Sequence, residues 1–184
     1  MTLSEETKAA IQAEYDAWKD IQYGGKDKAQ RAKFGQFFTP PPLTIKMLEK
    51  FDSIKGKTML DPTLGAGGLI AAAVIAGADP RKCYGIELDG AILEIAKRRL
   101  VKLGVPPHHL VQGDALVSKS YEDLEDDSEE CKSFAAVEKL EDGSLKIYAA
   151  VAGKAVKEKT VSDKAQANSI LAKLKSRGVK LIKL

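Results

Sequence analysis

The sequence predicts an α/β protein whose centre is half of a doubly wound parallel sheet, preceded by a helix and followed by a small α+β unit. Two observations predict this class. Strand-like and helix-like segments alternate between residues 58 and 112, which is typical of a parallel sheet whose strands are joined by helices. After residue 131 the order becomes strand, strand, helix, strand, which we interpret as a separate ββαβ unit.

Composition is that of a globular protein able to bury a core. The chain has 184 residues, of which 44% are hydrophobic and 30% charged. No apolar stretch approaches the roughly 18 residues of a membrane span, and the acidic N-terminus differs from a secretory signal. We therefore expect a cytoplasmic protein without membrane association. Cys83 and Cys131 lack metal-ligand spacing, so we interpret them as reduced structural residues and expect no metal site.

Charge divides the chain into segments. Residues 121–130 hold seven acids and no base, whereas residues 131–184 hold twelve Lys or Arg against five Asp or Glu. We predict an N-terminal helical segment (1–33), a core (34–120), an acidic linker (121–131) and a basic unit (132–184). A basic surface can contact nucleic acid. Because its lysines are spread over strands and helix with few aromatics, a solvated surface is the favoured interpretation.

Two helices are predicted before the core. The first begins at Ser4, a good N-cap followed by acids that suit the helix dipole. It is predicted to end at Tyr23-Gly24-Gly25 and to bury one face made of Ala10, Ile11, Tyr15 and Trp18. The proline run 40–42 cannot lie inside a helix, so the second helix is predicted over 43–51, with an inward face made of Leu43, Met47, Leu48 and Phe51.

The core pattern predicts three strands and two helices. The strands are expected at 58–60, 83–86 and 110–112, and the helices at 69–76 and 91–103. In the second of these helices Ile92 and Leu100 are expected to be buried, and Arg99 to be exposed.

The C-terminal unit is predicted from a hairpin signal and a helical pattern. Asp142-Gly143 separates strand-like runs at 133–140 and 145–152, as hairpin turns do. Ser162 is expected to cap a helix over 163–176, and a last strand is expected at 179–182. The buried face of that helix is predicted to consist of Ala167, Ile170, Leu171 and Leu174.

Each of the three core strands is followed by a carboxylate. Asp61, Glu87 and Asp114 stand at or just after the three strand ends. Ligands of doubly wound sheets bind outside the carboxyl ends of the strands, so we expect these side chains to share one site. At such a position Glu87 can accept hydrogen bonds from ribose hydroxyls, and Asp114 can accept one from an adenine amine.

A glycine-rich turn joins the first strand to its helix. Gly65, Gly67 and Gly68 lack a Cβ atom, so a ligand can approach the backbone closely. The helix that follows offers free N–H groups to an anionic part of that ligand. Such a turn alone is shared by several classes of nucleotide-binding protein.

Together these motifs resemble a known family. The sequences Asp61-Pro62-x-x-Gly65-x-Gly67-Gly68, Gly85-Ile86-Glu87-Leu88-Asp89 and Gly113-Asp114-Ala115-Leu116 are similar to the cofactor motifs of adenine-N6 DNA methyltransferases. Gly35-Gln36-Phe37-Phe38-Thr39-Pro40 resembles the aromatic-Thr-Pro motif that precedes them in the gamma arrangement, as in modification subunits of restriction systems. The resemblance covers about 82 residues. An NAD-type enzyme would instead show Gly-x-Gly-x-x-Gly near its N-terminus.

The resemblance implies a Rossmann-like half-sheet of the class I methyltransferase fold that binds S-adenosylmethionine or S-adenosylhomocysteine. It places the methionine part near the glycine turn and the aromatic-Thr-Pro motif, the ribose at Glu87 and the adenine at Asp114. The cofactor residues that it implies are Phe38, Thr39, Asp61, Gly65, Gly67, Glu87 and Asp114.

The family's catalytic motif does not occur in this sequence. Such enzymes hold the target amine, on an adenine flipped out of the duplex, with an Asn/Asp-Pro-Pro-Tyr/Phe segment. Neither proline run here, 40–42 or 106–107, has an acid or amide before it and an aromatic after it. We therefore predict no catalytic residue. Loss of the group that polarises the amine is expected to lower the rate on the order of 10³-fold or more.

Three functional interpretations remain open. In the first, the chain is a truncated methyltransferase that binds the cofactor in a regulatory, structural or anti-restriction role. In the second, it is part of an active DNA methyltransferase whose catalytic motif comes from a partner chain or an unrecognised segment. In the third, it is a non-enzymatic structural protein of a phage or mobile element. A half-sheet leaves an open edge, so we expect the C-terminal unit, self-association or a protein partner to cover it.

Overall fold

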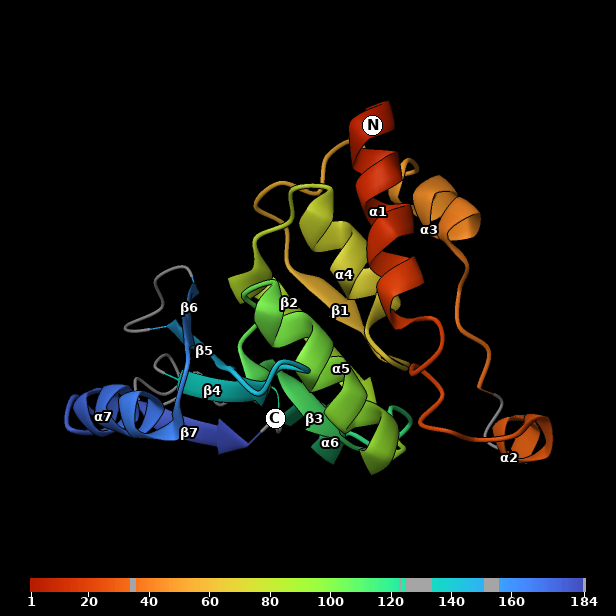
Figure 1. Ribbon diagram of the computed structural model, residues 1–184. Helices are drawn as coiled ribbons and strands as arrows, with labels where there is room; N and C mark the ends of the chain where they lie inside the picture. Colours follow the sequence, from red (N-terminus) through yellow and green to blue (C-terminus); the bar gives the residue numbers. More distant parts are fainter. Residues whose placement is uncertain (34–35, 123, 125–133, 151–155, 184) are drawn as a thin grey trace. The chain divides into compact units, whose positions relative to one another are not determined.

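The computed structural model describes residues 1–33, 36–122, 124, 134–150 and 156–183 (Figure 1). The chain forms two compact units, Met1–Leu124 and Glu125–Leu184. Cys131 and most of the predicted acidic linker lie outside the described residues.

The first unit contains the predicted parallel sheet. Its strands are β1 (Met59–Asp61), β2 (Cys83–Glu87) and β3 (Leu110–Gln112), in the order β1-β2-β3. Both neighbouring pairs are parallel, with Asp61 opposite Gly85 and Glu87 opposite Gln112. Helices α4 (Gly68–Ile75) and α5 (Gly90–Lys102) join the strands and contact each other. The mixed α/β class and the alternation of strands and helices are therefore confirmed.

Short elements complete this unit. The 3₁₀ turns η1 (Pro80–Lys82) and η2 (Pro107–His109) precede β2 and β3, and α2 (Lys28–Lys33) and α6 (Lys119–Glu122) are single short helices. In η2, the ring of His109 stacks on Tyr84 with 4.1 Å between centroids. No group of His, Cys, Asp and Glu among the described residues could hold a metal ion. Within the same ranges, no helix has the length and apolar character needed to cross a membrane.

Helix α1 (Glu5–Trp18) begins where the sequence predicted. The Ser4 hydroxyl accepts a hydrogen bond from the Thr7 N–H group. The predicted C-terminus was wrong, because the helix ends at Trp18 and residues 19–25 form turns. Bonds of the i→i+3 type, such as Ile21 N–H to the Trp18 carbonyl, replace the helical ladder there. Ile11 is buried as predicted, whereas Ala10 is exposed.

Helix α3 (Pro41–Leu48) buries a different face from the one predicted. Its inward residues are Pro41, Thr44 and Leu48, whereas the three other residues of the predicted face are 40–50% exposed: Leu43, Met47 and Phe51. The helix begins at Pro41, because proline suits the first helical position. The stripe that packs inward therefore runs through positions 41, 44 and 48, which have helical spacing.

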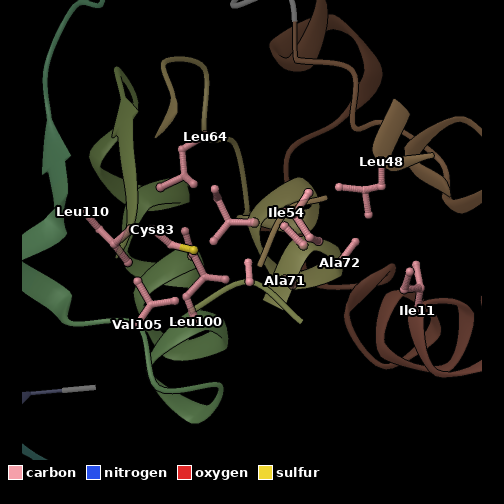
Figure 2. Close-up of a cluster of buried hydrophobic side chains, with 14 of the residues drawn as sticks. Ile11, Leu48, Ile54, Leu64, Ala71, Ala72, Cys83, Leu100, Val105 and Leu110 are labelled. Carbon is pink, nitrogen blue, oxygen red and sulfur yellow. The ribbon is translucent and has the colours of Figure 1, made fainter. Parts of the chain in front are cut away.

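The core of the first unit is centred on the alanines of α4 (Figure 2). Ala71 and Ala72 lie between two sets of larger side chains. Ile11 of α1 and Leu48 of α3 lie on one side, and the other side carries Cys83, Leu100, Val105 and Leu110. Because alanine is small, α1 and α3 can approach α4 closely, and both contact it. Burial raises the pKa of the Cys83 thiol to about 12, which agrees with a structural role for this residue.

Arg99 of α5 is buried, which corrects the prediction of an exposed side chain. Only 1% of its side chain is accessible. Its guanidinium binds both carboxylate oxygens of Glu14 on α1, and Nη1 donates to the carbonyl of Ala66 at 3.2 Å. A guanidinium can be buried when a carboxylate pairs with it and its remaining N–H groups find acceptors. Helical periodicity alone could not reveal a partner 85 residues away in sequence.

The second unit has one strand more than predicted. It consists of β4 (Phe134–Lys139), β5 (Leu145–Ala150), β6 (Lys157–Val161), α7 (Lys164–Lys175) and β7 (Lys180–Lys183). The sheet order is β6-β5-β4-β7, with β4 and β7 parallel and the other pairs antiparallel. The predicted ββαβ order is therefore corrected to βββαβ.

Strand β6 was missed because it is a polar edge strand. Its first four residues, Lys157 to Thr160, are exposed, and only Val161 is buried. The N-cap of α7 is Asp163, which accepts a hydrogen bond from the Gln166 N–H group, and not Ser162 as predicted. The predicted inner face of α7 is confirmed for Ala167, Ile170 and Leu171, which pack in one cluster with residues of β5 and β6, whereas Leu174 is not part of that cluster.

Candidate functional site

A cavity of about 640 Å³ lies in the first unit and includes residues from the carboxyl end of β1 and β2 and from the segment after β3. This volume is within the range of small-molecule sites, roughly 300 to 1,000 Å³. The cavity is lined by residues from several separate parts of the chain. Six segments contribute in all: the α1 region, residues 36–39, Met47 of α3, the glycine turn after β1, residues 86–88 and residues 113–116.

Six of the seven residues predicted for the site line this cavity: Phe38, Thr39, Asp61, Gly65, Glu87 and Asp114. They come from segments up to 76 positions apart in sequence, and the parallel sheet brings them together. Gly67 is the exception. A Cβ atom there would meet the Leu100 side chain at 2.8 Å, so the missing side chain makes room for α5.

Gly65 is required by both its backbone and its surroundings. Its φ of +53° lies in the left-handed region that glycine adopts readily. A Cβ atom would lie 2.7 Å from the ring of Phe38. The aromatic ring of the segment before the core therefore packs directly on the glycine turn after β1.

Glu87 joins the glycine turn to the end of β2. One carboxylate oxygen accepts from the Gly65 N–H group at 2.7 Å, and the other accepts from Asp89 N–H at 2.9 Å. Burial raises the pKa of Glu87, and the hydrogen bond from Gly65 N–H, the charge of Lys26 and the Leu88 backbone oppose the rise. Each oxygen has further acceptor capacity, so Glu87 can bind a ligand hydroxyl without leaving its backbone partners.

Asp61 is the most buried acid of the site, at 7% exposure. Its carboxylate accepts hydrogen bonds from the N–H and hydroxyl groups of Thr63, at 3.0 and 3.4 Å. Burial raises the pKa of Asp61, and the nearby charge of Glu87 adds to the rise. Two acids with raised pKa values at one cavity are typical of a functional site.

Asp114 is exposed at the end of the segment after β3. Its carboxylate accepts from the Leu116 N–H group at 2.9 Å. The N–H group of Gly113 donates to the Glu87 carbonyl at 3.1 Å, which keeps this segment beside β2. A Cβ atom on Gly113 would lie 2.3 Å from the Ser120 hydroxyl oxygen, so a larger residue would displace the turn.

The chain before α3 is fastened to the site at two places. The rings of Tyr23 and Phe38 lie 4.5 Å apart, and the Arg31 guanidinium lies 4.2 Å from the centre of the Tyr23 ring. Asp89 receives a hydrogen bond from the Gln36 amide at 2.9 Å and an ion pair from Lys26. These contacts hold Phe38 and Thr39 over the cavity.

Sequence reasoning missed several lining residues. Tyr15, Gln22 and Met47 line the cavity, although none belongs to a recognisable motif. Tyr15 and Gln22 fall in a segment that the sequence assigned to a separate N-terminal helix. Met47 was expected in the core, and its half-exposed side chain forms part of the cavity wall.

The residues present fit an adenosyl cofactor. Gly65 lines the cavity, and its lack of a Cβ atom leaves room there for the Phe38 ring. Half-buried Glu87 can accept a hydrogen bond from a ribose, exposed Asp114 can accept one from a purine amine, and Asp61 lies at the carboxyl end of β1. No lysine or arginine is found among the described residues that line the cavity, so none would repel a positively charged ligand group there.

Comparisons with known proteins agree with this geometry. Residues 25–137 match the family described as N-6 DNA Methylase. Over 105 residues the chain is 30% identical to the Type II methyltransferase M.VspI of Vibrio sp. (strain 343). That alignment covers 56% of this chain and 26% of the relative, so the chain spans about a quarter of the relative's length. No solved structure matches the chain.

Proposed function

Because the chain belongs to the N-6 DNA methylase family, whose members use S-adenosylmethionine, we propose that its first unit binds this cofactor in the cavity beyond the strand ends. One observation carries the proposal. Six residues predicted from separate motifs line a single cavity of suitable volume. Chance similarity of short motifs would not be expected to bring these residues together.

Each lining group has a role in holding the ligand. Glu87 accepts hydrogen bonds from the ribose hydroxyls, as acids at this position do in dinucleotide sites. Asp61 and Gly65 line the methionine part, and Phe38 with Thr39 covers it. Asp114 accepts a hydrogen bond from the adenine amine. When bound, the cofactor supplies an electrophilic methyl group on its sulfonium.

A calorimetric titration tests the proposal. We expect the chain to bind S-adenosylmethionine and S-adenosylhomocysteine with dissociation constants below about 1 mM, and Glu87→Ala to abolish binding. Glu94→Ala is the matched control, because Glu94 is exposed on α5 and pairs only with Lys97 among the described residues. Absence of binding by the unchanged chain would reject cofactor binding altogether.

We expect methyl transfer to need a catalytic group that none of the recognised motifs supplies. In the resembling enzymes an Asn/Asp-Pro-Pro-Tyr/Phe segment holds the target adenine, and this sequence contains no such segment. The function proposed for the chain is therefore to bind the cofactor, in a regulatory, structural or anti-restriction role. Methylation of adenine in DNA would require a catalytic group from a partner chain or from an unrecognised segment.

A transfer assay separates binding from catalysis. The chain is incubated with unmethylated DNA and cofactor carrying a tritiated methyl group. We expect no incorporation above background at cofactor concentrations that saturate the site. Incorporation by the chain alone, if removed by Glu87→Ala but not by Glu94→Ala, would show that this chain supplies its own catalytic group.

A further inference from the structure

Gln22 is a buried polar residue in the wall of the cavity. It lies in the turn that follows α1, and it is 3% exposed. Its backbone N–H group donates to the Trp18 carbonyl at 2.9 Å. Its side-chain amide makes no hydrogen bond to any residue in the described parts of the chain. Gln22 therefore offers a nearly buried amide to a ligand in the cavity.

The position of this turn is fixed from both sides. Tyr23, the next residue, packs on Phe38, which itself covers Gly65. At Gly24 a Cβ atom would lie 3.5 Å from the side chain of Ile95 on α5. Gln22 is therefore held close to the part of the cavity where Phe38 meets the glycine turn.

We propose that the Gln22 amide binds the amino-acid end of the adenosyl cofactor, an assignment that rests on the proposed function. The other end of the ligand has its own acceptors in Glu87 and Asp114. A primary amide both donates and accepts hydrogen bonds, so it matches an α-carboxylate beside an α-ammonium group. Gly68 and Leu69, which begin α4, also line the cavity, and the N–H groups of a first helical turn favour a carboxylate.

The proposal makes α1 and its following turn part of the binding site. Tyr15 of α1 lines the same cavity. Helix α1 also contacts α4, so it holds the turn and the glycine-rich segment in one arrangement. In the proposed complex the Gln22 amide gains hydrogen-bond partners from the ligand.

The test compares two ligands that differ only at this end. S-adenosylhomocysteine has the amino-acid end, and 5′-methylthioadenosine lacks it. Both are titrated into the full chain and into Gln22→Met, which keeps the side-chain length and removes the amide. We expect Gln22→Met to weaken binding of S-adenosylhomocysteine about tenfold or more, equal to about 1.4 kcal/mol. Binding of 5′-methylthioadenosine should change less than about twofold.

Gln12→Met is the matched control, because Gln12 is exposed on α1 and bonds to Asp16, and it should leave both affinities unchanged. Equal weakening of both ligands by Gln22→Met, or no weakening of either, overturns the assignment while leaving the proposed function intact. If the unchanged chain binds neither ligand, both proposals fail.

Thermal unfolding distinguishes a ligand-binding glutamine from a structural one. Removing a glutamine that hydrogen-bonds within the fold would lower the melting temperature. Replacing an unpartnered buried amide by an apolar side chain of similar shape is neutral or stabilising. We expect Gln22→Met to melt at or above the temperature of the unchanged chain. A lower melting temperature would show that the amide has a partner within the fold and would contradict the proposal.

Discussion

The two sheets of this chain differ in where the carboxyl ends of their strands lie. In the first unit all three strands run in parallel, so their carboxyl ends lie at one edge, and Asp61, Glu87 and Asp114 are found at one cavity. In the second unit β4, β5 and β6 are antiparallel neighbours, and their carboxyl ends alternate between the two edges. The comparison shows how a parallel arrangement converts three separate sequence motifs into one site.

The largest expected effect on the free energy of unfolding comes from comparing one ion pair in each unit. Arg99 and Glu14 of the first unit form a buried pair, with 1% and 16% of their side chains exposed, whereas Lys146 and Glu158 of the second unit are 26% and 59% exposed. We expect Arg99→Met to lower the free energy of unfolding by about 3–5 kcal/mol, because it leaves a buried charge unpaired. Lys146→Met should cost less than about 1 kcal/mol. Denaturant unfolding of the two variants measures both values.

The two variants can also be compared by their effect on the glycine turn of the site. Because Arg99 also binds the Ala66 carbonyl, amide hydrogen exchange in the glycine turn should be faster in Arg99→Met and unchanged in Lys146→Met. Equal costs for the two variants would contradict the distinction between a buried and a solvated pair.

Two glycines with positive φ sharpen the comparison. Gly65 has a φ of +53° and would place a Cβ atom 2.7 Å from Phe38, whereas Gly143 has a φ of +84° and nothing within 4 Å. Each change to alanine should cost about 1–2 kcal/mol for the left-handed backbone. Only Gly65→Ala should also displace Phe38 and weaken cofactor binding, about tenfold or more. A Gly143→Ala variant that loses cofactor affinity would break the account of a site confined to the first unit.

The buried acids predict a pH dependence. Burial raises the pKa of Asp61 and Glu87 in the folded chain. Between their usual and raised pKa values the folded chain therefore binds more protons than the unfolded chain. The free energy of unfolding should fall as pH rises through this window and level off above it. Cofactor affinity should rise across the same window, since the ionised carboxylates are the better acceptors.

Asp61→Asn tests this directly. The amide oxygen can keep the hydrogen bond from the Thr63 N–H group, while the buried charge is removed. Thermal unfolding across the weakly acidic range should show a smaller loss of stability with rising pH, and affinity for the cofactor should fall about tenfold. A variant with an unchanged pH profile would mean that Asp61 titrates at its usual pKa.

The smallest effect concerns the cap of α7. Asp163 accepts the hydrogen bond from Gln166 N–H at 2.8 Å, and Ser162 does not cap the helix. Asp163→Ala should cost about 1 kcal/mol, and Ser162→Ala less than about 0.5 kcal/mol. Chemical denaturation that ranks the two in reverse would restore the cap that the sequence predicted.

Sequence patterns correctly predicted the helices and strands whose bounds depend on neighbouring residues in the sequence. Strand β3 has the predicted bounds, and α4 and α5 each begin and end within one residue of the predicted positions. Asp61 and Glu87 could be assigned to one edge because parallel strands end together. Strand β6 was missed, since an edge strand with charged residues lacks the alternation that identifies a half-buried strand.

Contacts between distant segments could not be predicted in the same way. The burial of Arg99 depends on Glu14, and the place of Gln22 in the cavity wall depends on how the turn after α1 packs. The buried face of α3 depends on its start at Pro41, two positions before the predicted start at residue 43. In each case the packing between distant segments determines which side chains are buried, and helical periodicity alone does not. That the C-terminal unit, self-association or a protein partner covers the open edge of the half-sheet stays a prediction.

A titration of the labelled full chain with S-adenosylhomocysteine, followed by nuclear magnetic resonance, tests the central claim most directly. The claim is that one site in the first unit binds the cofactor. The account predicts that the amide signals of Gly65, Glu87 and Asp114 shift with a single saturation curve, while that of Gly143 in the second unit does not move. Absence of shifts at the three site residues, or saturable shifts centred on the second unit, would contradict it.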